Sequence, residues 1–278
     1  MFKKLLLSAI LATGLASGAS AAPAGGKIAD VDFSFEGPFG RFDAFQLQRG
    51  LQVFTESCAS CHGLQYLSYR NLSDAGGLGW TEDQMKAYTG QFKVYDAEAD
   101  DFRVAVPTDN FPSSQIDGAP DLTLMAKARA GFSGPYGLGI NQVVKGMGGA
   151  EYIAAILNGF DEPPECAPED FDGTYNSVFA PGGYPESCVD EEGHRMTAGS
   201  WMGMPQPLSE EGIDYADGSP NDIHGQAVDV AAFLMWTAEP KMMDRKQAAL
   251  VWVGFLILLT ILLYLTNKRI WAKVKRKD

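Results

Sequence analysis

The chain has 278 residues, with 22 basic and 35 acidic side chains and a formal net charge of −13. This acidic balance argues against nucleic acid as a partner and favours partners with basic surfaces. Once two non-globular segments at the ends are set aside, the remaining length fits one domain with a sizeable core rather than two.

Residues 1–21 have the pattern of a cleaved secretory signal peptide. Lys3 and Lys4 precede an apolar stretch over 5–15, and small residues follow at 19–21. A membrane-spanning helix is the alternative, but the apolar run has roughly half of the ~20 residues that a span needs. We therefore expect export, and the short segment favours a bacterial periplasm over a mitochondrial destination.

Residues 248–266 predict a membrane anchor, because they contain no charged side chain and are long enough to cross the hydrocarbon as a helix. A buried core helix is the alternative, but the run has no polar face. Six cations follow it: Lys268, Arg269, Lys273, Lys275, Arg276 and Lys277. Cations beside a span prefer the cytoplasmic side, so we expect the tail inside and the preceding domain outside.

The predicted organisation is therefore a signal peptide (1–21), a periplasmic domain (22–243), a membrane anchor (244–267) and a basic cytoplasmic tail (268–278). Without the signal and the tail, 14 basic residues stand against 34 acidic ones, so the exported part carries about −20. Solubility alone is an alternative reason for such a charge.

Cys58, Cys61 and His62 form the pattern C-x-x-C-H, which is typical of covalent haem attachment. Two thiols one helical turn apart can form thioethers with the two vinyl groups of a haem, while the adjacent histidine can bind the iron. A thioredoxin-like redox pair and half of a zinc site are the alternatives. Neither accounts for the adjacent histidine, and His194 and His224 are too far along the chain for zinc-site spacing. The sequence therefore predicts one covalent haem c.

A helix is predicted to deliver this motif. Asp43 is a suitable N-cap, and Leu47, Leu51, Phe54 and Cys58 recur at intervals of four, three and four.

A second helix is predicted near the end of the domain, where Ser219-Pro220 would begin it and Glu239-Pro240 would end it. Residues 228–236 form its apolar body, and we expect it to pack across the helix that begins at Asp43.

A methionine opposite His62 would favour electron transfer and raise the haem potential. Met204 is the best candidate, because Gly203-Met204-Pro205-Gln206-Pro207 predicts a stiff, extended loop. Met202 is a near competitor, and the local sequence separates the two only weakly, since most methionines fill cores.

Several segments together resemble the cytochrome c1 family, and they occur in the order that this family shows. They are CASCHGLQYLSYRNL, GAPDLTLMAKARAG, GGAEYIAAILNGFDEPP, MGMPQPL, DYADGSP and DVAAFLMWTAEPKMMDRK. The resemblance covers nearly all of the mature chain. It implies a mainly α, class I cytochrome c-like haem domain with long loops, followed by one C-terminal transmembrane helix.

The resemblance also implies the roles of individual residues. Cys58 and Cys61 would hold the haem covalently, with His62 and Met204, rather than Met202, as the axial iron ligands. The haem pocket would include Pro120, Arg129 beside a propionate, and Tyr152. A buried propionate needs a cation or hydrogen-bond donors, which gives Arg129 its physical reason, whereas Tyr152 could equally be a plain core residue.

Two departures from the family pattern stand out. Ala119 lies where many relatives have a second proline, and a glycine-rich insertion occupies about 132–146.

Cys166 and Cys188 lie in an acidic, Pro/Gly-rich stretch and are predicted to form a disulfide, because the compartment is oxidising. Closing such a loop removes roughly 3 kcal/mol of unfolded-state entropy. We expect this bond to brace the loop that leads to Met204; stabilisation of the loop alone is the alternative.

The resemblance implies a haem c subunit of a ubiquinol-cytochrome c reductase, a redox subunit and not an enzyme on its own. It would take electrons from the Rieske iron-sulfur subunit, sit beside cytochrome b in a dimeric complex and reduce a basic cytochrome c. Two acidic clusters could steer that partner: Asp96, Glu98, Asp100 and Asp101, and Glu162, Glu165, Glu169 and Asp170. A stand-alone anchored carrier and a haem-based ligand sensor are the alternatives.

Overall fold

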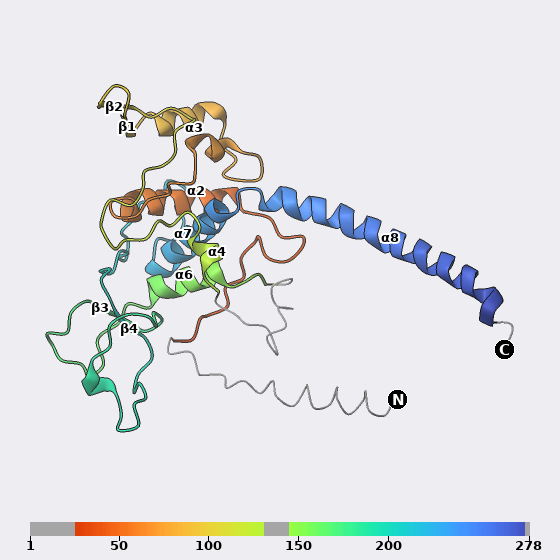
Figure 1. Cartoon of the computed structure of the whole chain (residues 1–278). Coiled ribbons are helices and arrows are strands. Elements are labelled where there is room, and N and C mark those ends of the chain that lie inside the picture. Colours follow the sequence, from red (N-terminus) through yellow and green to blue (C-terminus); the bar gives the residue numbers. More distant parts are fainter. Residues whose placement is uncertain (1–25, 131–144, 276–278) are drawn as a thin grey trace.

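The computed structural model describes residues 26–130 and 145–275, and this part of the chain is mainly helical, as predicted (Figure 1). The α-helices are α2 (Ala44–Val53), α3 (Glu82–Thr89), α4 (Met125–Ala128), α6 (Gly149–Asn158), α7 (Ile223–Ala238) and α8 (Met242–Lys275). Shorter helical turns are η1 (Phe54–Cys58), η2 (Tyr69–Ser73) and η4 (Glu186–Cys188). Two antiparallel strand pairs join β1 (Lys93–Asp96) to β2 (Asp101–Val104) and β3 (Thr174–Asn176) to β4 (Ser200–Met202).

Helix α2 begins where the sequence predicted it. The Asp43 carboxylate accepts hydrogen bonds from the backbone N–H groups of Phe45 (2.9 Å) and Gln46 (3.4 Å), as an N-cap does. The predicted apolar face is buried: Leu47 and Leu51 are almost fully enclosed. The remaining face, with Arg49 and Gln52, carries the polar side chains of the helix.

Helices α2 and α7 pack against each other at the centre of the domain, which confirms the predicted pairing. Gly50 makes the close approach possible, because a Cβ atom there would lie 2.1 Å from the carbonyl oxygen of Asp229. Beside it, Arg49 donates from Nε to Asp229 (2.7 Å) and from Nη1 to Asp217 (3.1 Å). The close backbone approach at Gly50 and the largely buried Arg49–Asp229 ion pair therefore fix how α2 crosses α7.

The start of α7 differs from the prediction. The N-cap is Asp222, whose carboxylate accepts from the N–H of Gly225 (3.0 Å), and not Ser219. The Asp217 side chain accepts from the N–H of Ser219 (3.0 Å), and Gly218 has a φ of +70°. This turn removes Ser219 from the helix start. The end at Glu239, before Pro240, is as predicted.

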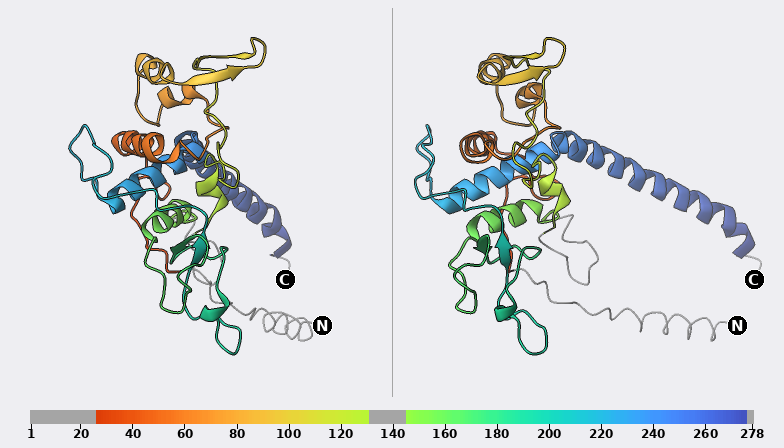
Figure 2. Two further views of the ribbon diagram at one scale, coloured as in Figure 1. Left: turned by 90° about the vertical axis from the view of Figure 1, so that its left-hand side faces the viewer. Right: turned by 60° about the vertical axis from the view of Figure 1, so that its left-hand side comes forward.

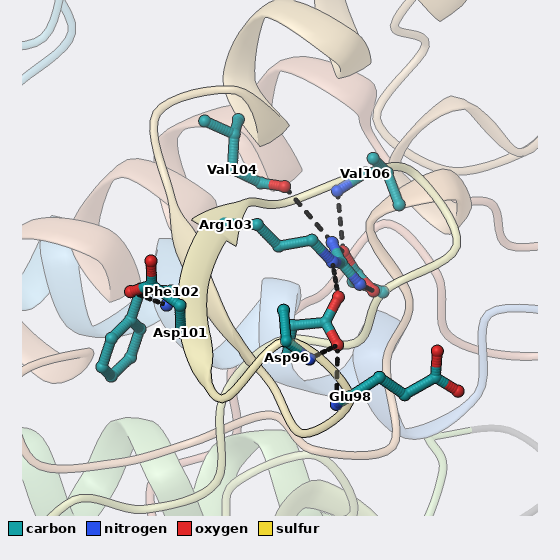
Figure 3. Close-up of polar contacts among 9 residues, drawn as sticks. Asp96, Glu98, Asp101, Phe102, Arg103, Val104 and Val106 are labelled. Carbon is teal, nitrogen blue, oxygen red and sulfur yellow. Dashed lines mark hydrogen bonds and ion pairs between the residues drawn. The ribbon is translucent and has the colours of Figure 1, made fainter.

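Helices α6 and α4 pack on α7, and smaller units flank this helical centre. Figures 1 and 2 show α3 and the β1–β2 hairpin on one side and the β3–β4 pair on the other. The hairpin is braced by Arg103, which pairs with Asp96 (3.0 Å) and Asp109 (2.6 Å); Figure 3 shows Asp96 facing this guanidinium.

Helix α8 continues from the domain almost without a linker (Figure 1). It is the one helix among the described residues that is long and apolar enough to cross a membrane, and none of its apolar span is buried. It reaches Lys275, so the start of the predicted basic tail is helical. At its first turns, Lys246 donates to the carbonyls of Phe35 and Gly40, and Glu239 pairs with Arg245 and with Lys127 (3.0 Å).

Candidate haem site

The C-x-x-C-H motif lies where α2 widens and then turns. The N–H of Ala59 donates to the carbonyl of Phe54 (2.8 Å), a five-residue spacing typical of a π turn. The Thr55 hydroxyl donates to the Leu51 carbonyl (2.8 Å) and so satisfies a helix acceptor from the side chain. The sequence periodicity did not predict this widening.

The two motif cysteines flank a tight reversal of the chain. The N–H groups of Cys61 (3.1 Å) and His62 (2.9 Å) both donate to the carbonyl of Cys58. This shared acceptor draws the two cysteines and His62 into one compact turn at the end of the helix.

The His62 ring is oriented by the backbone of a distant loop. Its Nδ1 lies 2.8 Å from the carbonyl oxygen of Pro120. A carbonyl oxygen can only accept, so Nδ1 carries the proton and the lone pair of Nε2 is free to bind a metal. The loop is fastened to the motif by Gln115 N–H to the Cys61 carbonyl (3.1 Å) and Leu122 N–H to the Gly63 carbonyl (2.9 Å). The structure thus brings together two predicted site residues, His62 and Pro120.

The four cysteines separate into two kinds. Cys166 and Cys188 are joined in a disulfide with their Cα atoms 5.1 Å apart, whereas Cys58 and Cys61 are free. Burial, with a smaller contribution from Cys61, raises the pKa of the Cys58 thiol to about 12. This thiol is therefore neutral at physiological pH, and replacing its S–H by a thioether costs no buried charge.

The free sulfurs and the free imidazole nitrogen fit a covalent haem c. Cys58 and Cys61 would hold the porphyrin, and His62 would bind its iron on one side. When bound, the haem supplies one-electron redox chemistry. The two cysteines of this chain would attach it, and the Pro120 carbonyl orients the imidazole that would bind it.

A cavity of about 110 Å³ lies beside the turn, and its lining includes His62, Thr55 and Tyr88. The hydroxyls of Thr55 and Tyr88 are 2.7 Å apart. Because Thr55 already donates to the Leu51 carbonyl, Tyr88 is the donor in this pair. Burial raises the pKa of Tyr88 to about 12, so it keeps this proton. Thr55 and Tyr88 tie the turn to α3, a role that no motif in the sequence indicated.

The other predicted site residues lie on separate elements. Met204 is half-buried and follows β4 by two residues. Tyr152 is half-buried in the first turn of α6. Arg129 is exposed at the end of a described segment, and its Nη1 donates to the Ala128 carbonyl (3.2 Å). The glycine-rich insertion falls largely at 131–144, outside the described residues.

Comparison with known proteins identifies the family. The profile of the Cytochrome C1 family matches residues 33–274. The chain is 54% identical over its full length to cytochrome c1 of Cereibacter sphaeroides and 49% identical over 98% of its length to cytochrome c1 of Rhodobacter capsulatus, covering 98% of each relative. It is also 38% identical, over 86% of its length, to 35% of cytochrome b/c1 of Bradyrhizobium diazoefficiens. The chain therefore belongs to the cytochrome c1 family, the membrane-anchored, haem c-carrying electron-transfer subunits of the bc1 complex.

Proposed function

We propose that this chain takes single electrons from the Rieske iron-sulfur subunit of a bacterial bc1 complex and passes them to a basic cytochrome c. The observation that carries this proposal is the His62 ring, fixed by Pro120 with its Nε2 free, beside two free cysteines on one turn. Met204 would supply the second iron ligand, and a haem with histidine and methionine ligands favours electron transfer over ligand binding.

Met204 as the distal ligand is supported by its position at the end of a paired strand. The following residues, Pro205 and Pro207, restrict the backbone of the loop. Arg129 is proposed to contact a haem propionate, and Tyr152 to lie near the haem edge. Loss of Met204 in a Met204→Leu variant should open the iron to carbon monoxide in the reduced protein.

The location of the domain is part of the same proposal. A signal peptide over 1–21, a single span in α8 and the cations after it support a periplasmic haem domain with a cytoplasmic C-terminus, in the bacterial inner membrane. The partners in the membrane would be cytochrome b and the Rieske subunit, in a dimeric complex, with lipid around α8.

Docking of a basic cytochrome c is supported by exposed acids at two places. Glu98, Asp100 and Asp101 are exposed at the tip of the β1–β2 hairpin, whereas Asp96 is already paired with Arg103. The second cluster (Glu162, Glu165, Glu169 and Asp170) is exposed before β3. If these acids steer the partner, the rate of electron transfer falls steeply with added salt.

Difference spectra of gently solubilised membranes test the proposal. Ascorbate-reduced minus oxidised spectra report haem c, and dithionite minus ascorbate spectra report low-potential b haems. Co-purification of b haem with this chain is the expected result. A c-type band alone would instead favour the stand-alone carrier, and carbon monoxide binding by the native reduced protein would favour the ligand sensor.

A further inference from the structure

The strand that leads to Met204 is held on both of its edges. On one edge, β4 pairs with β3 in the register Thr174↔Met202, Tyr175↔Trp201 and Asn176↔Ser200. On the other edge, the N–H and the carbonyl of Trp201 both bond to Gly183, at 2.9 Å each. A three-residue strand is therefore fixed along its whole length, and Met204 lies two residues beyond its end.

The side chain of Trp201 adds a packed anchor to this strand. It is only 3% exposed and lies against three aromatic rings: Phe171 (centroids 5.2 Å apart), Tyr175 (4.8 Å) and Tyr184 (6.0 Å). Aromatic packing of this kind resists sliding of the strand along its axis.

A buried carboxamide connects the strand pair to α6. Asn176 has no exposed surface. Its Nδ2 donates to the carbonyl of Ile156 in α6 (2.8 Å), and its Oδ1 accepts from the N–H groups of Val178 (3.1 Å) and Phe179 (3.0 Å). One side chain thus joins a helix to the turn that follows β3.

Ser200 carries this connection across to β4. Its hydroxyl donates to the carbonyl of Phe179, the same residue whose N–H is bound by Asn176. It also accepts from the N–H of Gly182 (2.9 Å). Ser200 is fully buried, so no water replaces these bonds. The path from α6 to Met204 is a chain of directional contacts through Asn176, the 177–179 turn, Ser200 and β4.

We propose that Asn176, acting through Ser200, is a positioning residue for the distal haem ligand: it fixes the place of Met204 relative to α6. The proposal rests on the proposed function, in which Met204 binds the haem iron. An aspartate at 176 would lose the donor to Ile156. An apolar residue would leave the N–H groups of Val178 and Phe179 without partners, and the Ile156 carbonyl would keep only the Gly159 N–H (3.1 Å).

The test is to replace Asn176 by alanine in the full-length, haem-loaded protein and to measure the iron coordination. We expect the methionine–iron charge-transfer band of the oxidised haem to weaken and the midpoint potential to fall. Release of β4 from these contacts should raise the carbon monoxide-bound fraction of the reduced protein about tenfold or more at a fixed subsaturating gas concentration. Asn158→Ala is the matched control, because that exposed carboxamide likewise donates to a carbonyl of α6, that of Ala154 (2.7 Å), but makes no bond to the β3–β4 pair.

If Asn176→Ala does not accumulate, the same measurements are made on Ser200→Ala. This variant removes two hydrogen bonds of the same connection and keeps the buried carboxamide. A variant that melts earlier but keeps the charge-transfer band, the potential and the resistance to carbon monoxide would overturn the positioning role. Met204→Leu distinguishes failure of the positioning role from failure of the ligand assignment. If the reduced Met204→Leu protein does not bind carbon monoxide, Met204 is not the iron ligand, whatever the outcome at Asn176.

Discussion

Glu151 is expected to make the protein less stable as the pH rises from 5 to 8, and Glu151→Gln is expected to reduce this dependence. Burial also raises the pKa of the neighbouring Glu36, so a smaller dependence should remain. The side chain is 3% exposed in the first turn of α6. One carboxylate oxygen each from Glu151, Glu36 and Asp30 lies within 4.8 Å of the others. Burial, reinforced by the neighbouring Glu36, raises the pKa of Glu151 from 4.5 to about 8.

The sign and size of the effect follow from these two pKa values. The unfolded chain releases the Glu151 proton near pH 4.5, whereas the folded protein keeps it to about pH 8. The stabilisation is therefore complete below pH 4.5 and is lost as the pH rises through 8, at about 1.4 kcal/mol per pH unit. Between pH 5 and pH 8 the free energy of unfolding should fall by about 3 to 4 kcal/mol. Acids such as Asp109, whose pKa is lowered by Arg103, change stability only at lower pH.

Denaturant unfolding of the full chain in detergent, followed by circular dichroism at four pH values, measures this slope. Glu151→Gln should make this slope shallower, and the variant should be more stable than the wild type at pH 8. Glu162→Gln removes the same charge from an exposed place and should leave the slope as it is. An unchanged slope in Glu151→Gln would show that the reasoning about this carboxyl is wrong.

Three further predictions concern the helix crossing and the disulfide-closed loop before Met204. Arg49→Leu leaves Asp229 buried without its partner and should cost about 3 to 5 kcal/mol of unfolding free energy, which denaturant titration measures; adding Asp229→Leu should recover most of it. Gly50→Ala forces α2 away from the Asp229 carbonyl, so the yield of haem-loaded protein, read from its absorbance, should fall sharply. An undiminished yield would contradict the close packing of the two helices. Cys166→Ala should lower the haem midpoint potential by loosening the loop before Met204, and an unchanged potential in redox titration would contradict this.

Local chemistry explains what the sequence could predict here. Asp43 caps α2 with its own carboxylate, and the apolar spacing that follows it is a property of the helix alone. The free cysteines and His62 lie within five residues, so their grouping needed no tertiary information.

What could not be predicted depends on contacts between distant residues. The π turn is tied by Thr55 to Tyr88, which lies 33 residues away, and its widening leaves the apolar spacing unchanged. Strands β3 and β4 are too short for alternation to be visible, and Asn176 connects them to a helix 20 residues earlier. Ser219-Pro220 has the residue types of a helix start. In the structure, however, the Asp217 side chain accepts a hydrogen bond from the Ser219 N–H and holds this residue in a turn before the helix.

The junction between α7 and α8 has a mechanical consequence. Only Glu239, Pro240 and Lys241 separate the two helices, and Lys246 binds the backbone of the 35–40 segment from the first turns of α8. These contacts couple the orientation of the span to that of the domain. A charge-free stretch of about 28 Å matches an ordinary bilayer, and a thinner one would tilt it. That tilt would change the height of the C-x-x-C-H turn above the lipid surface, so bilayer thickness would set how far this turn stands from the membrane.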